Sequence, residues 1–272
     1  MFNYVKSMLG EPAQVHYLVD SDFRTVAQGW AQADGTGPLD LWAHRNPGRV
    51  YRTGDYTTDV AAWNAARDVL VDFRGDVMFL TPGAYSLAAS TWDVPYARIL
   101  GPERKSPRYG CAPAVRNTRI TFTGTHTLGA DSDGLEVGYL EFIPTTAVAV
   151  FTIATAVDDA YFHDFNWNTN GITADVLTTL FTFATTANRG WVIDQFSWFV
   201  DAPQGPVITS VIGLSDFVIS NFKNVCGDTL GTYVNTMLDL QTGSAASENI
   251  SIGPGIGLAS NAGTGAVTRA VD

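Results

Sequence analysis

The chain has 272 residues, of which 46% are hydrophobic and only 16% charged, and its formal net charge is −11. This length can bury a large core, and a charged fraction well below the roughly 25% of ordinary domains favours a regular β structure or an oligomer that hides surface. The acidic balance disfavours nucleic acids and polyanionic sugars as partners, and the sequence contains neither an apolar run long enough to span a membrane nor a secretion signal.

Residues 1–56 are predicted to form an irregular N-terminal arm outside the main body. A short apolar stripe ends at Gly10 and Pro12, and loop-rich segments follow. Aromatic and arginine side chains on an extended segment are typical of interface anchors. We interpret the arm as a docking segment; the alternative is that it packs along the side of its own body. The candidate partner-docking residues are Phe2, Val5, Phe23, Arg24, Trp30, Trp42, Arg45 and Arg49.

The segment TTDVAAWNAARDVLVDFRGDVMFLTPGAYSL (57–87) predicts a helix, a strand and a turn into a second strand. Asp59 is a plausible N-cap, and Val60, Trp63 and Leu70 follow at helical spacing. A helix over the open end of a β-solenoid would cover backbone groups and apolar side chains that no preceding coil can cover. We therefore expect a capping helix at the start of a body that comprises residues 57–272.

This segment resembles the N-terminal part of the pectate-lyase-like superfamily, in which a D-x-x-A-W/F-x-x-A helix precedes a G-x-V-x-x-P-x-G-x-Y turn. The resemblance implies a right-handed parallel β-helix, a fold that hosts lyases and hydrolases and also many phage tailspike and capsid-surface proteins. It covers about 30 residues directly and is specific for fold, not for activity. The matching positions are Asp59 to Ala66, then Gly75, Val77, Pro82, Gly83 and Tyr85.

A repeated pattern supports the same fold along residues 135–252. The stretches WVIDQFSW (191–198) and FVISNFKN (217–224) share a template with apolar residues at p, p+2, p+5 and p+7 and a polar residue at p+4. The same template fits residues 160–167 with Asp164 in the polar slot, and residues 135–142 with Tyr139 there. Each match predicts two strands joined by a corner, and Asn221 and Asn249 suit a left-handed corner.

One apolar column drawn through these matches predicts about eight coils. Its members are Phe79, Ile99, Ile120, Leu140, Phe165, Phe196, Phe222 and Ile250. The fold class expected is therefore all-β, a right-handed parallel β-helix with an N-terminal capping helix and an irregular N-terminal arm. A β-sandwich is the alternative, but its strands would not share a corner from one to the next.

Candidate catalytic residues are few. Glycoside hydrolysis needs two facing carboxylates, and Asp164 and Asp194 on neighbouring coils are the pair we would assign if the chain were an enzyme. Both occupy slots where solvated side chains are expected anyway, so we expect no catalytic residues. No motif indicates a metal site or a cofactor, and Trp167, Trp191 and Trp198 are predicted to lie inside the body.

The basic segment 101–119 lies in an otherwise acidic chain and would meet an acidic neighbour, either another copy or a partner shell. Together with the resemblance, the arm and the acidic body predict a non-enzymatic phage virion protein, a capsid decoration or cement protein. It would be made in the host cytoplasm, lie on the virion surface and contact the major capsid protein or another virion protein, as a homotrimer. The alternative is a tailspike-like glycan depolymerase or a glycan-binding tail fibre module.

Overall fold

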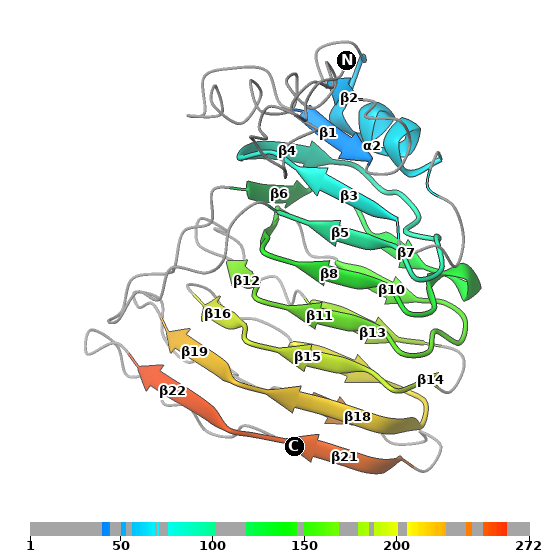
Figure 1. Ribbon diagram of the computed structural model, residues 1–272. Helices are drawn as coiled ribbons and strands as arrows, with labels where there is room; N and C mark the ends of the chain where they lie inside the picture. Colours follow the sequence, from blue (N-terminus) through cyan, green and yellow to red (C-terminus); the bar gives the residue numbers. More distant parts are fainter. Residues whose placement is uncertain are drawn as a thin grey trace, which may run out of the picture.

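The structure is a computed structural model that describes residues 40–43, 50–52, 56–68, 70, 76–101, 118–145, 150–168, 179–184, 188–200, 206–226, 238–240 and 247–259. Within these ranges the chain is mostly β, with three sheets and one α-helix, α2 (Asp59–Arg67). Within each sheet the strands follow one another level upon level, from α2 at one end of the molecule to β21 and β22 at the other (Figure 1). The prediction of an all-β structure built from parallel sheets is confirmed.

Sheets A, B and C are named here by their strands. The parallel strands of sheet A are β3 (Val77–Leu80), β5 (Arg98–Leu100), β8 (Glu136–Gly138), β11 (Tyr161–His163), β15 (Val192–Asp194), β18 (Leu214–Ser220) and β21 (Glu248–Ile252), with β14 (Asn188–Arg189) beside β18. Sheet B contains β4 (Gly83–Leu87), β6 (Thr118–Phe122), β9 (Glu141–Pro144), β12 (Asn166–Asn168), β16 (Ser197–Val200), β19 (Phe222–Cys226) and β22 (Gly255–Ala259). Sheet C contains β7 (His126–Leu128), β10 (Phe151–Ile153), β13 (Phe181–Phe183), β17 (Ile208–Ser210) and β20 (Leu238–Leu240).

From β8 onward the chain visits sheets A, B and C in a fixed order. β8, β9 and β10 are followed by β11, β12 and β13, and each new strand pairs in parallel with the strand of the same sheet one level before. A short 3-10 helix, η3 (Ala130–Ser132), precedes β8. Backbone hydrogen bonds therefore run between levels, and the side chains that alternate inward meet in the middle of the stack.

The repeat found in the sequence describes this interior correctly. The apolar positions of the match at residues 160–167 are Ala160, Phe162, Phe165 and Trp167, and all four are fully buried. Aromatic rings stack level on level in this interior, as Phe165 does on Phe196 with centroids 5.1 Å apart. Trp167 and Trp191 are buried as predicted, whereas the side chain of Trp198 lies outside the described residues.

The corner between sheets A and B is left-handed, as the template predicts. Tyr139, Asp164, Gln195 and Asn221 all have φ between 49 and 62°. Asn221 was predicted correctly, but Asn249 belongs to a different corner, where the chain enters sheet A. That second corner was not predicted, and its members also have positive φ: Tyr96, Gly134, Asp159, Gly190, Asp216 and Asn249.

The single apolar column expected from the sequence is divided between two sheets. Ile99 lies level with Met78, not with Phe79, and Ile250 lies level with Phe217, not with Phe222. Ile99 lies in β5 of sheet A, and Ile120 lies in β6 of sheet B, the next strand along the chain. The predicted column counted these two residues as two levels. Among the described residues sheet B has seven strands, whereas eight levels were expected.

Helix α2 covers the first levels of the stack, as predicted, but its cap differs from the prediction. The N-cap is Thr58, whose hydroxyl accepts a hydrogen bond from the amide of Ala61. Asp59 instead accepts one from the amide of Ser86 in β4 at 2.6 Å, and so ties the helix to sheet B. The buried face of the helix brings Trp63 against Trp92, with ring centroids 4.6 Å apart.

Two strands from the predicted arm join the stack. β1 (Asp40–Ala43) pairs antiparallel with β3 and with β2 (Val50–Arg52), so a hairpin extends sheet A beyond its first parallel strand. A hairpin that pairs with an edge strand satisfies backbone groups that would otherwise be free to pair with another chain. β1 and β2 are thus linked to the body by backbone hydrogen bonds.

Candidate functional site

The outward face of sheet A carries a group of polar side chains that we name the outer polar cluster. The parallel register creates it, because Glu136 lies level with Arg98 and Tyr161, while His163 lies level with Asp194. Residues two apart in a strand share a face, so these two rows point away from the buried row between them. The cluster consists of Arg98, Glu136, Tyr161, His163, Asp164 and Asp194.

Glu136 is held by the side chains of Arg98 and His163. Arg98 binds it through two nitrogens, Nε to Oε2 at 2.7 Å and Nη2 to Oε1 at 2.9 Å, and His163 Nε2 lies 3.3 Å from Oε1. Partial burial acts to raise the pKa of Glu136, but the hydrogen bonds from His163 and Arg98 outweigh it and lower that pKa to about 2. Glu136 is therefore an anion at neutral pH and serves as a fixed acceptor.

His163 is enclosed by aromatic rings and carboxylates. Its imidazole lies over Gly138, where an added Cβ would meet the ring at 2.6 Å, so only glycine leaves room at that level. Tyr161 stacks on the imidazole with centroids 4.4 Å apart, and Tyr139 meets its edge at 5.1 Å. Burial acts to lower the pKa of His163, but its contacts with Glu136 and with Asp164, 3.4 Å from Nδ1, raise it above the ordinary value.

Asp194 is a fixed acceptor at the next level. Its Oδ1 accepts hydrogen bonds from the hydroxyl of Ser220 at 2.7 Å and from the side-chain amide of Asn221 at 2.8 Å. Partial burial acts to raise its pKa, yet the hydrogen bonds from Ser220, Asn221 and Gln195 lower it overall. The left-handed corner thus has a second role, because it presents Asn221 to the carboxylate of the level before.

The two acids considered for catalysis lie on neighbouring levels. The backbone amide of Asp164 donates to the carbonyl of Asp194 at 3.1 Å. Asp164 contacts His163, whereas Asp194 is ionised at neutral pH because its pKa is lowered. A glycosidase needs one carboxyl that stays protonated until it protonates the leaving oxygen. Neither Asp194 nor Glu136 meets that requirement, so the cluster resembles a satisfied polar network more than an acid and base pair.

The docking residues expected in the arm fall largely outside the description. Trp42 lies in β1, level with Phe79 and Val50, and nothing is described of its side chain. The other docking residues lie outside the described residues: Phe2, Val5, Phe23, Arg24, Trp30, Arg45 and Arg49. Most of the basic segment 101–119 also lies outside them. Their role stays a prediction.

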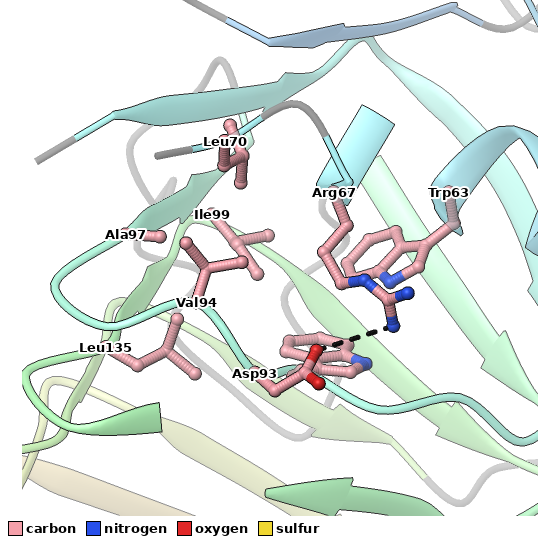
Figure 2. Close-up of a pocket in the computed structure, with 9 residues that line it drawn as sticks. Trp63, Arg67, Leu70, Asp93, Val94, Ala97, Ile99 and Leu135 are labelled. Atoms are coloured by element: carbon pink, nitrogen blue, oxygen red, sulfur yellow. Dashed lines mark ion pairs between the residues drawn. The ribbon is translucent and has the colours of Figure 1, made fainter. Parts of the chain in front are cut away.

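A small pocket lies where α2 meets the first levels (Figure 2). Its walls include Trp63, Leu70, Val94 and Leu135, and Arg67 reaches over it to Asp93 with 3.5 Å between Nη1 and Oδ1. The cavity measures about 10 Å³, which is room for about one water-sized sphere, and apolar cavities of this kind stay dry. The pocket is a packing gap beneath the cap and is too small for a ligand.

Two further properties bear on function. Within the described part of the chain, no group of three or more His, Cys, Asp or Glu side chains could hold a metal ion. No helix in the described ranges is long and apolar enough to cross a membrane.

Sequence reasoning missed the outer polar cluster because its members are far apart in the chain. Arg98 and Glu136 are 38 residues apart, and Glu136 and His163 are 27 apart. No motif links them, and the coils between them differ in length, so only the strand register brings them together. The usable signal was the alternation within YFHD (161–164), which places a histidine on the outward face of a predicted strand.

Comparisons with known proteins add little. No family model matches the sequence, and no curated protein matches it. Among solved structures, ORF18 of Geobacillus virus E2 matches with a TM-score of 0.21 and 11% identity, over 75% of this chain and 58% of that chain. The match therefore spans little more than half of ORF18, and a similarity at this level supports no inference about fold or function.

Proposed function

We propose that the chain is a non-enzymatic structural protein of a bacteriophage virion, a capsid decoration or cement protein that attaches through its N-terminal arm. The body would project from the virion surface, with copies associated as a homotrimer and bound to the major capsid protein or another virion protein. The support comes from the outer polar cluster, from the arm and from the way the strands are connected.

The proposed architecture of the body is a right-handed parallel β-helix. Successive strands of one sheet are parallel and are separated by a passage through the other two sheets. Crossover connections between parallel strands of one sheet are right-handed in about 98% of cases. Right-handed winding is therefore the expected hand of this stack. Such a body is rigid, because each level is bonded to the levels before and after it.

The observation that carries the non-enzymatic role is that carboxylates of the outer polar cluster already accept hydrogen bonds from neighbouring side chains. Glu136 and Asp194 are each held by at least two hydrogen-bond donors, and both have lowered pKa values. Catalytic carboxylates instead have environments that push their pKa values apart, so that one holds a proton. Carboxylates that are fixed as acceptors favour a structural role for this face.

The hairpin at the first level fixes the place from which an attached arm would extend. For residues 40–43 and 50–52, the pairing itself matches the alternative that the arm packs on its own body, so attachment is assigned to the candidate anchors before Asp40. The arm's strands β1 and β2 are hydrogen-bonded onto sheet A beside β3. A segment that begins before Asp40 would thus be joined to the body by a rigid ladder and not by a free linker. This geometry suits a protein that holds its body at a fixed angle to the surface it binds.

The test uses purified particles of the phage that encodes the chain, from which the protein has been removed. Re-addition of the full chain should restore it at a fixed copy number, measured by quantitative mass spectrometry. A chain that begins at Asp40 keeps β1 and β2 but lacks most candidate anchors, and it should fail to bind; so should the full chain with Phe23→Ala and Trp30→Ala. Rebinding of the shortened chain at the full copy number would contradict attachment through the arm.

A second candidate function is a glycan-binding or glycan-cleaving module. Tyr161 is 36% exposed and lies beside His163, Glu136 and Asp194. An aromatic face next to hydrogen-bonding groups is a common arrangement for holding a sugar ring. The full chain should leave host polysaccharide intact. Measured cleavage that is lost on Asp164→Asn or Asp194→Asn would overturn the decoration-protein proposal.

A further inference from the structure

A ladder of threonines runs along the outward face of sheet C. Thr127 lies level with Thr152, Thr152 with Thr182, and Thr182 with Thr209. An isolated bridge continues the ladder to Thr91 at the level before. Each of these side chains is half-buried, and the residues on either side of it in β7, β10, β13 and β17 point into the core. We name this row the threonine ladder.

The threonine ladder differs in charge from the outward face of sheet A. Sheet A presents Arg98, Glu136, His163 and Asp194, whereas the ladder has no charged member from Thr91 to Thr209. Asp239 follows at the next level and marks the end of the uncharged row. Because each copy carries a net charge of −11, copies repel one another unless their contact excludes like charges.

We propose that the threonine ladder is the surface through which copies of this chain associate. The inference deepens the self-association proposed above, on which it rests, by assigning it to one face. A second copy fits this face better than an unrelated partner, because both ladders then repeat at the same spacing of about 4.8 Å. Threonines that meet level by level can exchange hydroxyl hydrogen bonds and pack their methyl groups.

The neighbouring row supports the same assignment. Directly after the strands of sheet C, the backbone amides of Ala154, Ala184 and Val211 each donate a hydrogen bond to a carbonyl of the level before. All three residues are uncharged, and Val211 is an unusually exposed apolar side chain for this molecule, at 39%. Threonine and valine are branched at Cβ and have few side-chain rotamers, so ordering them at an interface costs little entropy.

The size of the face sets the expected strength. Five levels of about 4.8 Å and a width of about 10 Å give roughly 250 Å² per copy. Stable interfaces bury about 800 Å² per partner, so the ladder alone should support a weak contact. Attachment of neighbouring copies to one surface would raise their effective concentration and strengthen it, as it does for any tethered pair.

The test measures self-association of the full chain by sedimentation equilibrium up to about 1 mM. The wild-type chain should associate reversibly. Thr182→Glu and Thr182→Lys should each weaken association at least tenfold, because each places like charges against one another, and an equimolar mixture of the two should restore it. Thr182→Val, which keeps the branched shape, should associate within about threefold of the wild-type chain. Circular dichroism spectra should show that each variant is folded.

Matched controls lie on the other face. Val192→Glu and Val192→Lys change a half-exposed outward residue of sheet A and should leave association unchanged. A wild-type chain that stays monomeric at about 1 mM, or charge variants whose mixture does not recover, would overturn the assignment. These outcomes are independent of particle attachment, so a wild-type chain that does not self-associate in solution but still rebinds to particles at its full copy number would refute the ladder and leave the decoration role standing.

Discussion

Two histidines in this molecule occupy similar strands and have opposite acid-base properties. His126 begins β7 with its side chain inside the stack, and burial lowers its pKa to about 4. His163 ends β11 on the outward face. Partial burial acts to lower its pKa, but the contacts with Glu136 and Asp164 outweigh burial and raise that pKa. The inner face of a sheet offers aromatic rings and the outer face offers carboxylates, so the direction in which a histidine points decides whether its pKa is lowered or raised.

The surroundings of His126 explain its neutrality. Its Nδ1 accepts hydrogen bonds at 3.2 Å from Trp92 Nε1, which can only donate, and lies 3.0 Å from the hydroxyl of Ser90. An accepting Nδ1 is unprotonated, so the proton of the neutral ring is on Nε2. Rings of Phe122 and Phe151 surround it, with centroids 4.6 and 6.3 Å away. No carboxylate is among these contacts, so a charge there would be uncompensated.

The largest expected effect breaks the aromatic interior itself. Phe151 is fully buried and contacts rings from three levels, including Phe122, Phe162 and Phe181. Phe151→Ala should lower the free energy of unfolding by about 3–5 kcal/mol, measured by denaturant titration. Tyr161→Ala on the outer face is the matched control and should cost under about 1.5 kcal/mol. Equal costs would contradict the distinction between the inner and outer faces.

The next effect concerns pH and His126. Its folded pKa lies below the unfolded value of about 6.5, so the unfolded state binds the proton first, and stability is lost as pH falls from about 6.5 towards 4. The loss attributable to this group should reach about 3 kcal/mol. His126→Phe should remove that part of the pH dependence, because the ring stays apolar at every pH. Identical slopes for the two proteins would show that His126 can be charged in the folded state.

Asn221 tests the corner that joins the two faces. Asn221→Val should lower the free energy of unfolding by about 1–2 kcal/mol, because a β-branched residue resists the left-handed conformation at φ 49°. The same change removes the donor to Asp194. Asn221→Gly separates the two causes, since glycine adopts positive φ freely but lacks the amide. A loss below a few tenths of a kcal/mol for the valine variant would be inconsistent with a strained corner.

The smallest effect concerns His163. Its folded pKa is raised, so its contribution is fully present below about pH 6.5 and is lost as pH rises through the folded pKa. His163→Gln should therefore cost about 1 kcal/mol near pH 6 and less near pH 9, the opposite of the His126 profile. The measurement is the difference in thermal stability between the two proteins across this range. A cost that grows with pH would show that His163 is neutral in the folded protein.

The repeat made much of the body predictable. Apolar residues at p, p+2, p+5 and p+7 report burial directly, so Phe162 and Phe165 were placed correctly. Asp164 takes the left-handed corner as predicted, but the expectation of a solvated side chain was wrong, because Asp164 is buried beside His163.

The template does not include the second corner. Tyr96 occupies that corner, where it is 44% exposed at a left-handed position. The second corner lies directly before the first apolar position of each match, and Gly134, Asp159 and Asn249 there are residue types that adopt positive φ readily, so a template longer by one residue would have included it.

The candidate site was less predictable than the core. Asp164 and Asp194 were recognised as neighbours, because both belong to matches of the template. Their partners were not recognised, since Ser220, Glu136 and Arg98 depend on how far each coil advances before it returns. The threonine ladder was hidden for the same reason, because a lone threonine between two apolar residues is unremarkable until its strand is paired.

The sequence by itself determined which side chains are buried, because the period of two in a strand and the polar corner are local properties of consecutive residues. It also determined the capping helix, through the spacing of Val60, Trp63 and Ala66. Only the tertiary structure decided which residues of different coils lie level with one another, because coil length varies and backbone pairing fixes the register. That register determined the direction in which the pKa of His163 and that of His126 shift, and it assembled the threonine ladder on one face of the stack.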